Sequence, residues 1–143
     1  MLNRLDPAIG AFVLRLSLGV MLIAHGLLKV LVFTIPGTVG YFTSLGLPAI
    51  AAYATLAIEL IGGLAMIVGF QVRAVAAITV PVLLGAAIFG HGGNGWVFSN
   101  PNGGWEYPVF LTAAAVAQVF LGAGAFALGG TASAEARLAA AVR

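Results

Sequence analysis

The sequence from residue 7 to residue 33 reads PAIGAFVLRLSLGVMLIAHGLLKVLVF. This run is longer than the roughly 20 apolar residues that a helix needs to cross the hydrocarbon core of a bilayer. Asp6 stands directly before it as an N-cap, and Pro7 occupies a first-turn position where proline is tolerated. The stretch therefore predicts a first transmembrane helix over about residues 7–33.

Three further apolar segments follow the first one. They cover about residues 48–70, 73–90 and 107–129, and each is close to the length that spans a bilayer. Pro81 lies inside the third segment and predicts a kink there, which neighbouring helices can tolerate. Between the first two spans, residues 38–45 are expected to form a short amphipathic helix that ends at a glycine C-cap.

The composition supports a membrane protein. Of the 143 residues, 62% are hydrophobic and 7% are charged, whereas a soluble domain carries roughly a quarter of charged residues. The predicted fold class is therefore all-α, an integral membrane four-helix bundle forming one domain over residues 1–143, with the lipid bilayer as its solvent. The chain has no cysteine, which excludes disulfides, thiolate chemistry and iron–sulfur clusters. The basic residues are few and scattered, so nucleic acid is not an expected partner.

The positions of the arginines predict the topology. Arg4, Arg73, Arg137 and Arg143 fall near the amino end, in the second loop and in the carboxyl tail, while the first and third loops contain no Lys or Arg. The positive-inside rule then places both termini in the cytoplasm. The tail over residues 131–143 is expected to lie at the membrane interface as a marginal helix, or to be a frayed end.

The ionisable residues within the spans are the most informative ones. Arg15, His25 and Lys29 fall within an arc of about 80° on one face of the first helix, so that face is expected to point into the bundle. Glu59 lies in the middle of the second span, where a charge requires a partner. Counting residues from the membrane boundary puts Arg15 and Glu59 within about 6 Å in height. We therefore predict an Arg15–Glu59 ion pair, with His25 as a second candidate partner and Lys29 near the outer rim, snorkelling or meeting Glu106.

Polar and aromatic residues gather at the outer end of the predicted bundle. His91 ends the third span at nearly the height of His25, and together they can bind quinone carbonyls, a metal ion or a haem; alternatively, His91 only caps its helix at the water boundary. The aromatic residues of the third loop either wall a pocket or form an interfacial belt. Glu59 is a candidate functional residue, and a salt bridge that only locks two helices is the alternative. The candidate ligand-binding residues are Arg15, His25, Lys29, Glu59, His91, Trp105 and Glu106, and no metal site is assigned.

Several unlike motifs occur in a specific order along the chain. They are Arg15, GLLK at 26–29, YFTSLGLP at 41–48, Glu59, GFQVR at 69–73, GH at 90–91 and GGWEYP at 103–108. In this pattern the chain resembles the DoxX family of small bacterial membrane proteins, from about residue 8 to residue 128. The resemblance implies a four-helix membrane bundle, a location in the bacterial cytoplasmic membrane and an association with quinone-linked redox complexes. It also implies that Arg15, Lys29, Glu59, Arg73 and His91 are the polar positions of the family pattern.

Two functional hypotheses follow. In the first, the chain is a subunit of a membrane redox complex that interacts with an isoprenoid quinone, and Glu59 with His25 or His91 binds or deprotonates the quinol head group. The electrons then pass to a redox partner subunit. In the second, the chain is a non-catalytic assembly or stabilising partner, and its buried charges only hold the bundle. A proton path through Glu59 and a bis-histidine haem protein are weaker alternatives, and a homo-oligomer stays open.

Overall fold

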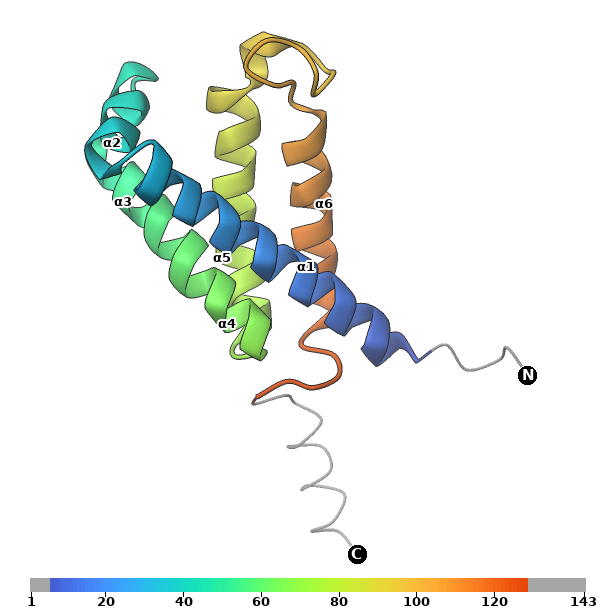
Figure 1. The fold of residues 1–143 in the computed structure, drawn as a ribbon. Coiled ribbons are helices and arrows are strands. Elements are labelled where there is room, and N and C mark those ends of the chain that lie inside the picture. The colour runs from blue at the N-terminus through green and yellow to red at the C-terminus, as the bar shows by residue number, and fades with distance from the viewer. Residues whose placement is uncertain (1–5, 129–143) are drawn as a thin grey trace, which may run out of the picture.

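The computed structural model describes residues 6–128, and every regular element in this range is helical (Figure 1). Three continuous helices, Pro7–Val32, Ala49–Val68 and Val72–Gly90, are long and apolar enough to cross a membrane. A fourth apolar helix, Glu106–Leu121, is shorter. The prediction of an all-helical protein with membrane-spanning helices is therefore confirmed for the described residues. The cytoplasmic placement of both termini stays a prediction.

Each of the three long helices contains a π-helical turn, which lies inside the second helix and forms the last turn of the first and third helices. In chain order the elements are α1 (Pro7–Leu27), η1 (Leu28–Val32), α2 (Ile35–Ser44), α3 (Ala49–Ala57), η2 (Ile58–Gly62), α4 (Gly63–Val68), α5 (Val72–Gly85), η3 (Ala86–Gly90), η4 (Gly92–Asn94) and α6 (Glu106–Leu121). Of these, η1, η2 and η3 are π-helical, and η4 is a single 3-10 turn. Such turns within α-helices are rare and frequently occur at functional sites.

The short helix α2 begins three residues earlier than the sequence predicted. Thr34 forms its N-cap, and the Thr34 hydroxyl accepts a hydrogen bond from the backbone N–H of Gly37 at 3.3 Å. Pro36 lies in the first turn, where the missing N–H costs nothing. Gly46, in the left-handed region with φ 79°, follows the helix as expected for a C-cap glycine.

Glycines bring α1 close to the second membrane helix. A Cβ added to Gly19 would lie 2.9 Å from the carbonyl oxygen of Gly63, and one added to Gly26 would lie 3.2 Å from the Cβ of Glu59. The close approach of the helices at these two glycines fixes the relative height of the antiparallel pair. Gly26 is level with Glu59, and Gly19 is level with Gly63. In Figure 1, α1 crosses the bundle diagonally, whereas α5 and α6 run side by side.

The packing is that of a protein solvated by lipid. A small buried cluster holds the helices together, and it consists of Leu18, Leu22, Met66, Val72, Val75 and Ala76. Large apolar side chains also cover the outside. Leu31, Ile61 and Phe110 are each more than 70% exposed, which water would penalise and lipid tails would not.

The fourth helix ends earlier than the expected boundary at residue 129. Gly122 takes φ 76°, and its carbonyl accepts a hydrogen bond from the Gln118 side chain at 2.6 Å, which stops the helix after Leu121. The chain then returns to the bundle, where the N–H of Ala125 donates to the carbonyl of Ala8 at 2.9 Å. The predicted span was therefore too long. The predicted interfacial tail over residues 131–143 lies outside the described residues.

Candidate functional site

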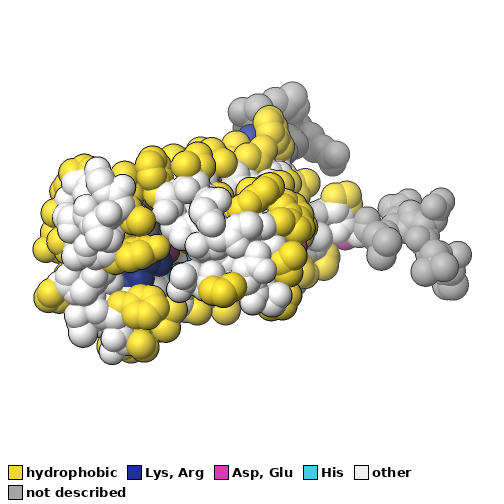
Figure 2. Space-filling view, turned by 90° about the horizontal axis from the view of Figure 1, so that it is seen from above, with side chains coloured by type: hydrophobic (Ala, Val, Ile, Leu, Met, Phe, Trp, Pro, Cys, Tyr) yellow, Lys and Arg dark blue, Asp and Glu magenta, His cyan; other side chains and the backbone are white. Residues whose placement is uncertain are grey.

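A cavity of about 910 Å³ lies between the helices at the end of the bundle that carries α2 and the loop after η3. Its walls come from α1, η1, α2, α3, η2, α5, η3 and α6. Seen from above, it is a hollow with a basic side chain at its floor (Figure 2). The basic group is Lys29, the lysine among the lining residues. Most of the lining is apolar, and the polar side chains are His25, Lys29, Thr38, Tyr41, Thr55, Glu59, His91 and Tyr107.

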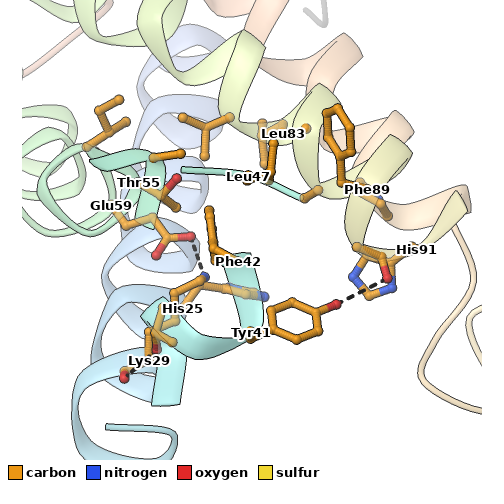
Figure 3. A pocket seen from close by; sticks show the side chains of 18 of the residues that line it. His25, Lys29, Tyr41, Phe42, Leu47, Thr55, Glu59, Leu83, Phe89 and His91 are labelled. Carbon is orange, nitrogen blue, oxygen red and sulfur yellow. Dashed lines mark hydrogen bonds and ion pairs between the residues drawn. The ribbon is translucent and has the colours of Figure 1, made fainter. Parts of the chain in front are cut away.

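Lys29 and Glu59 form an ion pair at one side of this cavity (Figure 3). The Lys29 ammonium donates to Glu59 Oε1 at 2.7 Å. Glu59 is only 5% exposed, and its second oxygen, Oε2, is buried and has no hydrogen-bond partner within residues 6–128. Buried carboxylate oxygens are normally satisfied. The pair therefore leaves one acceptor unused beside the cavity.

π-helical turns position the groups of the cavity. Lys29 lies in η1, Glu59 lies in η2, and His91 follows directly after η3. Each of these turns inserts an extra residue into its helix and so rotates the side chains that follow it. All three turns contribute to the cavity lining. The coincidence of three rare turns with one cavity supports a functional role for this end of the bundle.

His25 lies on α1 one turn before Lys29 and lines the same cavity. Its Nδ1 is 2.9 Å from the carbonyl oxygen of Met21. A carbonyl can only accept, so Nδ1 carries the proton. His25 was the second candidate partner for Glu59, but within the described residues the carboxylate is paired with Lys29 and makes no hydrogen bond to His25.

His91 and Tyr107 form a hydrogen-bonded pair on the α5–α6 side of the cavity. The Tyr107 oxygen is 2.6 Å from His91 Nε2. His91 Nδ1 is 3.1 Å from the carbonyl oxygens of both Asn102 and Gly103, so it is the protonated nitrogen. In the neutral ring, Nε2 then accepts the hydroxyl proton of Tyr107. Both ring nitrogens are occupied by protein groups, which argues against His91 as a haem or metal ligand.

Tyr41 and Thr55 were not identified as site residues from the sequence, and Tyr107 was considered only as part of the aromatic loop. The Tyr41 hydroxyl reaches from α2 towards η3 and makes a long contact of 3.5 Å with the Gly90 carbonyl (Figure 3). Thr55 lies one turn before Glu59 on the same helix, and this spacing could have predicted that both side chains share one face. For Tyr41 the sequence carried no comparable signal, because its distance from η3 depends on how α2 folds back.

The predicted Arg15–Glu59 ion pair is wrong. Arg15 is fully buried, and its guanidinium donates to the carbonyls of Met66 and Ile67 at 2.6 and 2.8 Å. It also donates to the carbonyls of Ala125 and Phe126 at 3.0 and 3.4 Å. Arg15 therefore binds the exposed carbonyls at the end of α4 and ties the segment after α6 to the bundle, which is favourable at a helix C-terminus.

The predicted position of Lys29 was also wrong, and both errors arose from the heights that were assumed for the helices. The sequence estimate assumed that both helices start at one height and run parallel to the membrane normal. Because Gly26 is level with Glu59, Lys29 lies near the carboxylate, whereas Arg15 lies eleven positions before Gly26, at about 1.5 Å of rise per residue. Lys29 therefore meets Glu59 and not Glu106.

Trp105 and Glu106 lie outside the cavity lining. Trp105 packs edge-on against Trp96, with ring centroids 4.5 Å apart. The Glu106 carboxylate accepts a hydrogen bond from the backbone N–H of Phe98 at 2.7 Å. Both residues hold the loop closed between η3 and α6. Of the seven candidate residues, the cavity thus brings together His25, Lys29, Glu59 and His91, and leaves Arg15, Trp105 and Glu106 elsewhere.

The described residues contain no group of three or more His, Cys, Asp or Glu side chains that could hold a metal ion. The polar groups of the cavity are hydrogen-bonding side chains on two of its walls. On one wall an ion pair with a free carboxylate oxygen stands near an imidazole, and on another a hydroxyl is bonded to a second imidazole. Between them the walls are apolar and aromatic. Such a site can bind and exchange protons with a flat ligand that carries oxygen atoms.

Comparison with known proteins agrees with the motif pattern. No solved structure matches the chain. A protein of Bacillus subtilis (strain 168) named "Putative oxidoreductase CatD" is 40% identical over 80 residues, which cover 56% of this chain and 58% of that protein. The alignment thus spans less than two thirds of the relative's length. The family model of DoxX matches residues 10–92, more than half of the sequence. The chain belongs to the DoxX family.

Proposed function

We propose that this protein is a quinone-interacting subunit of a membrane redox complex, placed in the bacterial cytoplasmic membrane. The observation that carries the proposal is the cavity beside the Lys29–Glu59 pair, in which a buried carboxylate oxygen has no partner within residues 6–128. Nearly every buried carboxylate oxygen in proteins has a hydrogen-bond partner. Oε2 has almost no accessible surface in this conformation, so a ligand hydroxyl would satisfy it after a small movement of the neighbouring side chains.

The size and lining of the cavity fit a quinone. Its volume of about 910 Å³ lies near the upper end of the range for small-molecule sites, roughly 300–1,000 Å³, so it can take a ring and part of an isoprenoid chain. Phe33 and Phe89 line the cavity and are about half exposed. Exposed apolar side chains in the lining suit a ligand that enters from lipid.

The polar groups provide for proton transfer. Glu59 Oε2 can accept the proton of a bound hydroxyl, and the contact with Lys29 at 2.7 Å stabilises the ionised form of the carboxylate. The Lys29 ammonium can also donate to a ligand oxygen, because its side chain is 19% exposed towards the cavity side. A bound quinone supplies the two-electron chemistry. The chain has no cysteine, so we assign the electron partner to another subunit.

The name of the Bacillus relative as an oxidoreductase supports the redox part of this proposal. The alternative is an assembly or stabilising partner, and one observation favours it. The Lys29–Glu59 pair joins η1 to η2, and Arg15 joins α1 to α4 and to the segment after α6. Both contacts would be useful in a purely structural bundle. The two proposals differ in whether the cavity is occupied.

The test is the quinone content of the purified protein. Wild type and Glu59→Gln are purified in mild detergent, extracted with organic solvent and analysed for isoprenoid quinone by mass spectrometry at matched lipid content. Glu106→Gln is the control, because it makes the same chemical change at a carboxylate outside the cavity. We expect stoichiometric quinone in wild type and Glu106→Gln, and loss in Glu59→Gln. No enrichment over bulk lipid in wild type would favour the assembly role.

A further inference from the structure

The hydroxyl of Tyr107 presents lone pairs to the cavity and no proton. Its single proton is donated to His91 Nε2, at an oxygen–nitrogen distance of 2.6 Å. His91 cannot supply a proton in exchange, because its Nδ1–H faces the carbonyls of Asn102 and Gly103 at 3.1 Å each. This wall of the cavity therefore accepts hydrogen bonds and does not donate them.

The imidazole of His25 also offers the cavity an acceptor and no donor. Its Nδ1–H is donated to the carbonyl of Met21 at 2.9 Å. In the neutral ring, Nε2 keeps a lone pair, and no partner for it occurs within residues 6–128. His25 lines the cavity from α1, on the opposite side from His91 (Figure 3). A second wall thus also offers an acceptor.

Two further groups offer acceptors. Thr38 donates its hydroxyl proton to the Lys29 carbonyl at 3.0 Å. Glu59 Oε2, in the ion-paired carboxylate, is an acceptor without a partner in the described chain. Against these stand the ammonium of Lys29, which has protons to spare, and the hydroxyls of Thr55 and Tyr41, which can donate or accept because the contact of Tyr41 with the Gly90 carbonyl, at 3.5 Å, is too long to hold its proton.

From this imbalance we infer that the cavity discriminates between redox forms and binds a hydroquinone more tightly than the corresponding quinone. A hydroquinone carries two hydroxyl donors on opposite sides of its ring, whereas a quinone carries only acceptors. Near Lys29 and Glu59 either form finds a partner. At Tyr107 and His91 only a hydroxyl does, and a carbonyl there would face a lone pair. The inference rests on the proposed function and specifies which form the site is built to hold.

The two residues that set this preference act in different ways. Tyr107 touches the ligand oxygen, and His91 is a positioning residue that holds the Tyr107 proton away from the cavity. Replacing His91 with Leu releases that proton, so Tyr107 becomes able to donate to a carbonyl. Replacing His91 with Gln keeps the pattern, because the amide oxygen accepts from Tyr107 and the amide N–H groups can donate to the loop carbonyls.

The experiment compares two forms of one probe. Decylubiquinol and decylubiquinone are titrated into nanodiscs with and without the protein, and binding is taken as the excess over empty discs. In wild type we expect the quinol to bind on the order of tenfold more tightly, from one to two hydrogen bonds that only the hydroxyl form makes. A tenfold preference raises the midpoint potential of the bound couple by about 30 mV.

The variants then identify the cause. His91→Leu should reduce the preference or reverse it, and His91→Gln should retain it. His25→Leu removes an acceptor on the other wall and leaves the loop unchanged. It therefore replaces His91→Leu as the test if the His91→Leu protein does not fold. Phe110→Leu, on the lipid-facing side of α6, is the control and should change nothing.

Each outcome is decisive. Equal affinity of the two forms in wild type, or tighter binding of the quinone, overturns the inference while leaving the proposed function in place. The same holds if the His91→Leu and His25→Leu proteins both keep the wild-type ratio. Binding of neither form above empty discs removes the proposed function and the inference together.

Discussion

Removal of one partner from the Lys29–Glu59 pair should destabilise the bundle unequally. Lys29→Met leaves a carboxylate on a side chain that is only 7% exposed, with Oε2 already unpartnered within the described chain. Glu59→Gln instead leaves an ammonium whose side chain is 19% exposed and reaches the cavity. The first change therefore strands a buried charge, whereas the second leaves a charge that water in the cavity can solvate.

The magnitudes follow from the geometry. Breaking a buried ion pair costs roughly 3–5 kcal/mol when the remaining charge has no other partner. Because the cavity borders this pair, we expect about 2–3 kcal/mol for Lys29→Met and about 1 kcal/mol for Glu59→Gln. The double variant carries no stranded charge and should cost about 1 kcal/mol. The coupling energy between the two sites is then about 2–3 kcal/mol.

The assay is the free energy of unfolding in mixed micelles, measured by titration with a denaturing detergent for each variant. A parallel cycle of Arg15→Met with Glu59→Gln provides the control, since Arg15 contacts the carbonyls of Met66 and Ile67 and not Glu59. That cycle should be additive within about 0.5 kcal/mol. Additivity for Lys29 with Glu59, or strong coupling for Arg15 with Glu59, would refute the assignment of partners.

Other consequences can be measured separately. Arg15→Met should cost about 3 kcal/mol of unfolding free energy, since it leaves several buried carbonyls without donors; a loss below that of a lipid-facing substitution would contradict this role. Gly19→Ala should cost about 1–3 kcal/mol, because its Cβ would lie 2.9 Å from the Gly63 carbonyl, whereas Gly10→Ala meets nothing within 4 Å and should be nearly neutral or stabilising. Ser99→Cys, in a chain without cysteine, should react with a membrane-impermeant maleimide added to whole cells or spheroplasts; labelling only after the cells are opened would reverse the predicted topology.

The sequence was sufficient for the parts of the fold that depend on composition and local pattern. The three long helices and the break at Gly46 follow from apolar runs, prolines and glycines, which act within a few residues. The length of α6 did not follow in the same way. Residues 122–128 are as apolar as a helix, but the positive φ of Gly122 and the contact with Ala8 turn them back onto the bundle. That contact is between distant parts of the chain.

The candidate site was predicted only in part, because the sequence identifies its residues but their contacts depend on distant parts of the chain. Glu59, Lys29, His25 and His91 are unusual residues for a membrane span, and the energetic cost of their burial marks them without any structure. Which of them meet depends on the relative heights and tilts of helices. The close approach of Gly19 to Gly63 sets those heights, and residue counting cannot supply them. Tyr107 was predicted as part of an aromatic loop, but its bond to His91 required the positions of η3 and α6.

The central claim is that the cavity beside Glu59 is the place where a quinone binds. The most direct test is photolabelling of the protein in nanodiscs with a photoreactive short-chain quinone, followed by peptide mapping with mass spectrometry. We predict labels on cavity residues such as Tyr41, Phe42 or Phe89, suppressed by excess decylubiquinol and by Glu59→Gln. Labels confined to lipid-facing residues such as Ile61 and Phe110, unaffected by the competitor, would contradict the claim.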